Sequence, residues 1–332
     1  MKIAVVGHSM VHPRQTNFFL ELAKLDHDVL VIAPGEWREQ HARAYSTTAG
    51  DNGKFTVQTL RHFGGEDVYR FKFIGLKDAI KDFDPDVLYV QQEPGSLVAA
   101  EAAGFDVKKA LFTWENIQAN LTPFASEVLS RYDLVVCGND EAENIVKEYN
   151  KNTIILPQVG VDTVHFQARQ QVDRYVDVAY IGRATEEKGV DKLLMAWQTA
   201  KVLPWQPYEQ LPWWFSMAKI VVCYSQDGVG WREQAMPYVA CEAMACGCSV
   251  VVSDAGSIPF WLNGGEGHFT YEGAPITCVP QSDTVVLKEA LSALLQNKEL
   301  RDLRAIAGRA WVEKYLSSQV IAERLAECLT NL

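Results

Sequence analysis

The chain has 332 residues, a net charge of −11 at pH 7 and 48% hydrophobic residues, which fits a soluble protein with two well-filled domains. Acidic residues are spread over both halves, which argues against a surface that tracks nucleic-acid phosphates. No stretch approaches the roughly 20 apolar residues of a membrane span, and no signal peptide is recognisable. The seven cysteines form no CxxC pair and are typical of small buried side chains in a reducing compartment. We therefore expect a cytoplasmic protein.

Buried-type strands alternate with helical segments along the chain. In the first half we expect strands at 2–7, 28–34, 86–91, 108–114, 134–138 and 153–157, with helices at 16–25 and 76–83. A less regular segment at 168–175 follows, and the pattern restarts with strands at 176–183, 219–225 and 248–254. The helices expected in the second half are 188–200, 211–218, 238–246, 283–296, 298–314 and 318–330. Such strand–helix repeats predict an α/β fold of two Rossmann-like domains with parallel sheets.

The restart of the pattern divides the chain near residue 160. We expect an N-terminal domain at 1–160 and a C-terminal domain at 161–315, with the last helix, 316–332, packed back on the first domain. Ligands of such sheets bind beyond the carboxyl ends of the strands. The functional site is therefore expected in the cleft between the domains.

The segment REQAMPYVACEAMACG places one carboxylate inside an apolar helix. Pro237 suits the first helical position, and Gly247 suits the residue just past the end, where a positive φ is needed. Met236 and Pro237 lie at the helix start, whose free N–H groups favour an anion. Glu242 lies in mid-helix, where a buried carboxylate is costly without a partner. That partner must come from the rest of the chain or from a ligand.

A second turn, YIGRATEEKGVDKLL, joins a strand to a helix. Gly182 ends the strand, and Arg183 and Lys188 flank the acidic residues Glu186 and Glu187. Two cations beside a helix N-terminus suit a diphosphate, whereas exposed ion pairs with the two glutamates are the alternative. The chain lacks the G-x-G-x-x-G, P-loop, H-E-x-x-H and G-x-S-x-G patterns. Nothing in the sequence indicates a metal site.

Taken in order, four segments make the chain resemble a retaining glycosyltransferase of family 4. They are LPQVGVDTVHF (156–166), YIGRATEEKGVDKLL (180–194), the block QAMPYVACEAMACGCSVVVSDAGSIPF (234–260) and the helical tail, while VQQEPGS (90–96) resembles the H-E-P segment of that family. The resemblance implies the GT-B architecture, in which two Rossmann-like domains face each other across a cleft. It also implies transfer of a sugar, with retention, from a UDP- or GDP-sugar to an acceptor hydroxyl on a glycan, a lipid-linked compound or a small molecule. No metal or other cofactor is expected.

The resemblance also implies roles for individual residues. Arg183 and Lys188, after Gly182, match the pair that holds the diphosphate of the donor. Glu242 matches the second glutamate of a two-glutamate motif and would bind the ribose hydroxyls. Met236 and Pro237 lie at the helix start, where backbone N–H groups would approach the sugar and the phosphate.

Three departures from the family pattern bear on the site. Gln234 stands at the first glutamate of the motif, where a neutral amide stabilises developing positive charge less; we favour it over an inward-turned Glu233. Gln92 stands at the histidine of the H-E-P segment and leaves Glu93 as the ionisable group. The connection 197–210 is short, so the C-terminal domain is expected to lack about one strand–helix unit. The expected catalytic residues are Arg183, Lys188, Glu93, Gln92 and Gln234.

Residues after two strands of the first half are candidates for the acceptor side. His8, His12 and Arg14 follow the first strand, and Trp114 and Glu115 end or follow the strand at 108–114. Arg14 suits an anionic ligand group or, equally, a helix cap or an ion pair at the rim, whereas His12 is more typical of a satisfied loop histidine. Trp114 suits stacking on a sugar face or, nearly as well, packing in the core.

Alternative interpretations stay open. The segment 70–83 mixes basic and apolar side chains and suits contact with an anionic membrane, although a surface helix covering the sheet is the simpler interpretation. The glutamines at positions 92 and 234 and the short connection also fit a GT-B protein that binds a nucleotide sugar or a partner chain without transferring sugar. A sugar-nucleotide epimerase of the same fold is a weaker alternative.

Overall fold

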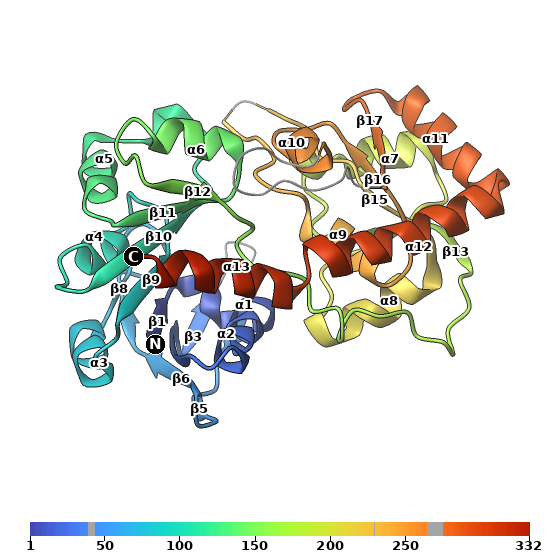
Figure 1. The fold of residues 1–332 in the computed structure, drawn as a ribbon. Helices are drawn as coiled ribbons and strands as arrows, with labels where there is room; N and C mark the ends of the chain where they lie inside the picture. Colours follow the sequence, from blue (N-terminus) through green and yellow to red (C-terminus); the bar gives the residue numbers. More distant parts are fainter. Residues whose placement is uncertain (39–43, 229, 264–274) are drawn as a thin grey trace. The chain divides into compact units, whose positions relative to one another are not determined.

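The computed structural model describes residues 1–38, 44–228, 230–263 and 275–332, which form two compact units (Figure 1). Unit 1 comprises Met1–Gly160 and Ile321–Leu332, and unit 2 comprises Val161–Val320. Each unit contains its own largely parallel sheet with helices packed on it, which is the layered arrangement that buried strands require.

The described part of unit 1 contains an eight-stranded sheet in the order β12-β11-β10-β9-β1-β2-β6-β5. All neighbouring strands are parallel except β5 and β6. The strands are β1 (Lys2–Val6), β2 (Asp28–Pro34), β5 (Gly50–Asp51), β6 (Phe55–Leu60), β9 (Val87–Gln91), β10 (Lys108–Thr113), β11 (Leu134–Cys137) and β12 (Thr153–Ile155). Two antiparallel ribbons pair β3 (Glu36–Arg38) with β4 (Ala44–Ser46) and β7 (His62–Phe63) with β8 (Lys72–Phe73). The strand order reverses between β1 and β9, the position where ligands bind in doubly wound sheets.

Short helices connect the strands of unit 1. They are η1 (His8–Val11), α1 (Pro13–Phe18), α2 (Leu20–Lys24), α3 (Leu76–Phe83), α4 (Leu97–Ala102), η2 (Gln118–Asn120), α5 (Pro123–Ser130), α6 (Asp140–Val146) and the part of α13 (Ser318–Thr330) from Ile321 onward. Leu76, Ala79 and Ile80 of α3 are buried in the hydrophobic core of the unit. The apolar face of the segment 70–83 is therefore largely accounted for by packing, as the simpler interpretation of this segment requires.

The described part of unit 2 contains a five-stranded sheet in the order β14-β13-β15-β16-β17, with all pairs parallel. The strands are β13 (Val176–Ile181), β14 (Lys201–Leu203), β15 (Ala218–Cys223), β16 (Ser249–Ser253) and β17 (Thr277–Val279). The helices are η3 (Glu186–Lys188), α7 (Val190–Ala196), η4 (Tyr208–Gln210), α8 (Leu211–Met217), α9 (Tyr238–Ala245), α10 (Ile258–Leu262), α11 (Thr284–Gln296), α12 (Lys298–Tyr315) and the start of α13. Here the strand order reverses between β13 and β15.

The short connection of unit 2 differs from the sequence expectation. It contains strand β14, which three residues form and which the hydrophobic pattern did not reveal. The helix expected at 188–200 ends earlier, at Ala196, because Trp197 leaves helical geometry with φ −142°. A single 3-10 turn, η4, precedes α8, so the connection keeps a strand and has little helix of its own.

Two arginines fix the end of α9, the helix that carries Glu242. Arg309 donates to the carbonyl oxygens of Phe166, at 3.2 Å, and of Ala245, while Arg174 Nη2 donates to the carbonyl of Cys246 at 2.6 Å. Cations and donors at the last carbonyls satisfy the open end of a helix. Gly247 follows with φ +73°, as the sequence predicted. Pro237 caps α9 and precedes its first helical residue, one position earlier than expected.

Candidate functional site

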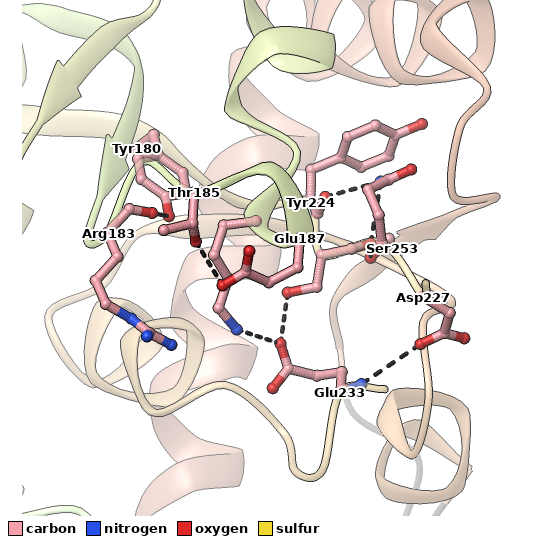
Figure 2. A network of polar contacts seen from close by, with 11 residues as sticks. Tyr180, Arg183, Thr185, Glu187, Tyr224, Asp227, Glu233 and Ser253 are labelled. Atoms are coloured by element: carbon pink, nitrogen blue, oxygen red, sulfur yellow. Dashed lines mark hydrogen bonds and ion pairs between the residues drawn. The ribbon is translucent and has the colours of Figure 1, made fainter. Parts of the chain in front are cut away.

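The first part of the candidate site in unit 2 is the turn after β13 (Figure 2). Gly182 N donates to the carbonyl of Leu203 at 3.1 Å and has φ +146°, a conformation that favours glycine. The Tyr180 hydroxyl donates to the carbonyl of Arg183, and the Thr185 hydroxyl donates to Glu187 Oε1 at 2.6 Å. These bonds hold the turn that carries Arg183 at the carboxyl edge of the sheet.

Glycine brings this turn onto the end of β15. Gly189 has φ +61°, and a Cβ atom there would lie 2.2 Å from the carbonyl oxygen of Tyr224. The backbone N–H of Gln226 donates to the carbonyl of Glu187 at 2.8 Å. The loops after β13 and β15 are therefore joined directly beside Lys188, at the point where the strand order reverses.

Lys188 forms an ion pair with Glu233. Its Nζ lies 2.7 Å from Glu233 Oε2, and the two side chains are only 20% and 11% exposed. The Ser225 hydroxyl donates to the same carboxylate oxygen, and the Lys188 ammonium lies 4.7 Å from the centre of the Trp231 ring (the carboxylate contacts are in Figure 2). Neither Glu186 nor Glu187 is the partner in this ion pair. The ammonium therefore faces the interior of the loop cluster and not the solvent.

Glu242 lies in the same electrostatic environment. It is 1% exposed on α9, next to the end of β15. Burial raises the pKa of the Cys223 thiol to about 12, and Lys188, Glu233 and Glu242 are the charged groups that act on this thiol. The charges of all three side chains are therefore close enough to act on the Cys223 thiol at the end of β15, although Lys188 is distant in sequence from the two glutamates.

Arg183 differs from Lys188 because its side chain is exposed. Partial burial raises the pKa of the neighbouring Glu187. The hydrogen bond from Thr185 and the charges of Arg183 and Lys188 outweigh this rise, so the pKa of Glu187 lies below its ordinary value. A fixed acidic group therefore lies beside both cations, and the guanidinium of Arg183 remains accessible to a ligand.

The structure shows the direction of one of the two candidates for the first-glutamate position. The Glu233 carboxylate is turned inward and holds Lys188, which is the alternative that the sequence analysis placed second. Gln234 is half-buried, Met236 is 5% exposed and Pro237 is half-buried. The only ionised group of this segment directed at Lys188 among the described residues is thus Glu233. A role for Gln234 with a sugar stays a prediction.

Unit 1 brings His8 and Gln92 together where its strand order reverses. A Cβ atom at Gly7 would lie 2.7 Å from the carbonyl oxygen of Gln91, so glycine permits close approach of the chain after β1 to the end of β9. Gln92 is 3% exposed, and its Nε2 lies 2.8 Å from His8 Nδ1. Its Oε1 has no hydrogen-bond partner among the described residues. A buried carbonyl oxygen of this kind suits a ligand donor such as a hydroxyl.

Glu93, the next residue, has a carboxyl whose pKa is raised towards neutral pH. Burial raises the pKa of its carboxyl to about 7, although hydrogen bonds from the Thr113 hydroxyl and from Trp114 N, the latter at 3.2 Å, favour the ionised form. The Glu115 carboxyl adds to the rise. A carboxyl that titrates near pH 7 suits proton transfer or a pH-dependent hydrogen bond.

Other residues proposed for the acceptor side have structural contacts. Trp114 packs edge-to-face on Phe112, with ring centres 5.0 Å apart, and a Cβ at Gly138 would lie 2.0 Å from its indole. Glu115 Oε1 accepts from Ile117 N at 3.1 Å and also from an asparagine side chain. These contacts support the packing alternative for Trp114 and a loop-stabilising role for Glu115.

His12 and Arg14 lie at the start of α1. The His12 ring lies 4.2 Å from that of Tyr45, and the Arg14 side chain is half-buried. The ring contact agrees with the interpretation of His12 as a loop histidine. The role of Arg14 stays a prediction.

Sequence reasoning missed several residues at the carboxyl edge of the unit 2 sheet. Ser225, Asp227 and Trp231 lie in the loop after β15, and Gln281 follows β17. They belong to none of the quoted motifs, and their contacts join loops from different strands. The only signal available was their place after apolar strands, since side chains at such ends meet at one edge of a parallel sheet.

The described ranges contain neither a metal-binding cluster nor a membrane-spanning helix. Within those ranges, no three His, Cys, Asp or Glu side chains are grouped so that they could hold a metal ion. Within the same ranges, no helix combines the length and the apolar character needed to cross a bilayer.

Known proteins share this fold. A sucrose-phosphate synthase from Thermosynechococcus elongatus is 13% identical with a TM-score of 0.74, and the match covers 100% of this chain and 98% of that chain. Anabaena HepE in complex with UDP-glucose is 14% identical with a TM-score of 0.70, and the match covers both chains fully. An E. coli structure described as trehalose-6-phosphate bound with UDP-2-fluoro glucose is 12% identical with a TM-score of 0.73, covering 100% and 99% of the chains. The fold is that of the GT-B glycosyltransferases.

The sequence comparisons cover less of the chain. Residues 167–297 match a family profile described as glycosyl transferases group 1, which is less than half of the 332 residues. The matched segment contains Arg183, Lys188, Glu233 and Glu242. No match was found among curated protein sequences.

Proposed function

We propose that the chain is a retaining glycosyltransferase of family 4, which transfers a hexosyl group from a nucleotide diphosphate sugar to an acceptor hydroxyl. The observation that carries this proposal is the cluster of Arg183, Lys188, Glu233 and Glu242 at the reversal point of unit 2. Cations at the carboxyl edge of such a sheet suit a diphosphate, and a buried carboxylate beside them suits the hydroxyls of a pentose. The matched glycosyl transferases group 1 segment supports the same assignment.

A UDP-sugar is the first donor to test, because similar solved structures are described with UDP-glucose or UDP-2-fluoro glucose. The bond between the anomeric carbon and the diphosphate oxygen breaks as negative charge grows on the leaving group. Arg183 and Lys188 stabilise that charge, so the proposed reaction proceeds without a metal. The acceptor oxygen then bonds to the anomeric carbon on the same face, and its proton passes to a phosphate oxygen.

In the proposed reaction, binding of the donor includes an exchange of partners at Lys188. Its ammonium donates to Glu233, and the diphosphate takes the place of this carboxylate. Glu233 is then available for sugar hydroxyls, while Gln234 can donate or accept a further hydrogen bond. From unit 1, we assign contacts with the sugar or acceptor to Gln92 and Glu93.

The direct test is release of UDP from a panel of UDP- and GDP-sugars, with and without candidate acceptor alcohols. Lys188→Ala should reduce turnover about 100-fold or more, the usual effect of removing one charge-stabilising group. Lys192→Ala is the matched control, because Lys192 lies four residues further on, in α7, and donates instead to Gln226 at 2.7 Å and Ser282 at 3.0 Å. Equal turnover in wild type and Lys188→Ala would refute the diphosphate assignment.

A second function is favoured by the two glutamines at catalytic positions. Gln92 and Gln234 are neutral where the resembled family has ionisable groups, which fits a protein that binds a nucleotide sugar without transferring it. Thermal stabilisation by a UDP-sugar, with neither UDP release nor glycosylated product in mass spectrometry, would support this function over catalysis.

A further inference from the structure

Asp227, in the loop after β15, joins several loops at the carboxyl edge of unit 2, and Figure 2 shows its contact with Glu233. Its Oδ1 accepts from Glu233 N at 3.4 Å, and its Oδ2 accepts from Gly256 N at 3.0 Å. Gln281 Nε2 donates to Oδ2 at 3.2 Å, and Gln281 Oε1 accepts from Asp227 N at 2.7 Å. The Asp227 side chain therefore links the loops after β16 and β17 to the loop that runs from β15 to α9.

The backbone of Glu233 is held from a second side by the turn after β16. Ser257 N donates to the carbonyl of Glu233 at 2.9 Å. Gly256 has φ +48°, and a Cβ atom there would lie 2.1 Å from the same carbonyl oxygen. With its N–H facing Asp227 and its carbonyl facing Ser257, Glu233 has little freedom to rotate about its backbone.

We propose that Asp227 is a positioning residue that fixes Glu233 so that its carboxylate faces Lys188. The contacts explain why an aspartate is suited to this place. Three N–H groups from different loops point at one carboxylate, and only an acceptor-only side chain can satisfy all of them. An asparagine would present its NH₂ group to at least one of these donors and leave a polar group without a partner.

The fixed position of Glu233 would also favour donor binding, a consequence that rests on the proposed function. When a diphosphate binds Lys188, the Glu233 carboxylate loses its cation, but the backbone of Glu233 stays held by Asp227. The carboxylate then remains at the edge where the donor sugar would lie, which lowers the cost of ordering it on binding. The positioning of Glu233 itself does not depend on any ligand.

The experiment measures the reactivity of Lys188 in the intact protein without nucleotide. The rate of acetylation of Lys188 by acetic anhydride is followed by mass spectrometry in wild type, Asp227→Asn, Glu233→Gln and the double variant. An ammonium that donates to Glu233 is protected, so Asp227→Asn should raise the rate several-fold towards that of Glu233→Gln. In the Glu233→Gln background Asp227→Asn should add nothing, since coupled residues are non-additive.

A matched control removes the same charge elsewhere in unit 2. Asp283→Asn keeps the cap of α11, where Asp283 accepts from Val285 N at 3.1 Å and Val286 N at 3.0 Å, and should leave Lys188 acetylation unchanged. If Asp227→Asn does not fold, Gln281→Ala removes two contacts of Asp227 and should shift the rate in the same direction by less. An unchanged rate in the folded variants, or equal increases in both backgrounds, would overturn the inference.

The same variants separate this inference from the proposed function. If Lys188 is protected from acetylation and the two substitutions are non-additive as expected, but the protein binds no nucleotide, only the proposed function is refuted. Turnover of a UDP-sugar by the wild type, with Lys188 acetylation insensitive to Asp227→Asn, would refute the positioning role alone.

Discussion

Replacing Glu93 by glutamine should change how the stability of unit 1 depends on pH. Burial raises the pKa of this carboxyl from 4.5 to about 7 in the folded protein. Between those values the folded state keeps a proton that the unfolded state has lost, so unfolding releases a proton. The free energy of unfolding must therefore fall as pH rises through this window and level off above about pH 7.

The size of the effect follows from the pKa values. A tenfold change in an ionisation constant corresponds to about 1.4 kcal/mol, so a rise from 4.5 to about 7 makes ionisation of the folded state costlier by about 3 kcal/mol. Glu93 is partly accessible to solvent, so we expect a measured loss of about 2 kcal/mol between pH 5 and pH 8. Glu93→Gln has no proton to lose and should lack this part of the pH dependence.

Urea denaturation of the full chain at pH 5, 6, 7 and 8, with hydrogen exchange of unit 1 peptides as a local readout, tests this reasoning. Glu148→Gln, an exposed carboxylate on the same unit, is the control and should retain the wild-type pH dependence. If Glu93→Gln and the wild type lose the same stability between pH 5 and pH 8, the attribution of the raised pKa to burial of Glu93 is wrong.

Three further predictions concern unit 2. Lys188→Met should lower the free energy of unfolding by about 2–3 kcal/mol, because it leaves the poorly exposed Glu233 carboxylate without its cation; Lys188→Met/Glu233→Gln should recover most of the loss in urea denaturation. Gly256→Ala should cost more than about 2 kcal/mol, since its Cβ would meet the carbonyl of Glu233, and an unchanged melting temperature would contradict the close approach. Arg309→Met should cost about 1–2 kcal/mol by opening the end of α9 at Ala245, measurable as faster hydrogen exchange of that helix; unaltered exchange there would argue against the cap.

Local patterns predicted much of the secondary structure. The buried strands β1, β2, β9 and β15 and the last three helices, α11, α12 and α13, lie close to the expected ranges, because long apolar runs and periodic helices leave clear signals. The three-residue strands β14 and β17 left almost none. They are strands because a neighbour, β13 or β16, offers its hydrogen-bonding edge.

The residues of the candidate site were likewise only partly predictable from the sequence. Arg183, Lys188 and Glu242 were visible in the sequence, since each stands in a short pattern whose chemistry can be read from neighbouring residues. The pairing of Glu233 with Lys188 was not visible, and for the first-glutamate position the sequence analysis favoured Gln234 over an inward-turned Glu233. Which side chain turns inward depends on the backbone direction at position 233, and the loops after β15 and β16 set that direction through hydrogen bonds and the close approach at Gly256.

The sequence by itself determined the alternation of strands and helices and pointed to Arg183, Lys188 and Glu242 as candidate site residues, because local propensity and residue chemistry are properties of neighbouring positions. The tertiary structure alone decided which of those residues meet, which carboxylate holds the lysine and how strongly Glu93 retains its proton. Those outcomes depend on burial and on contacts between loops distant in sequence, which no local pattern encodes.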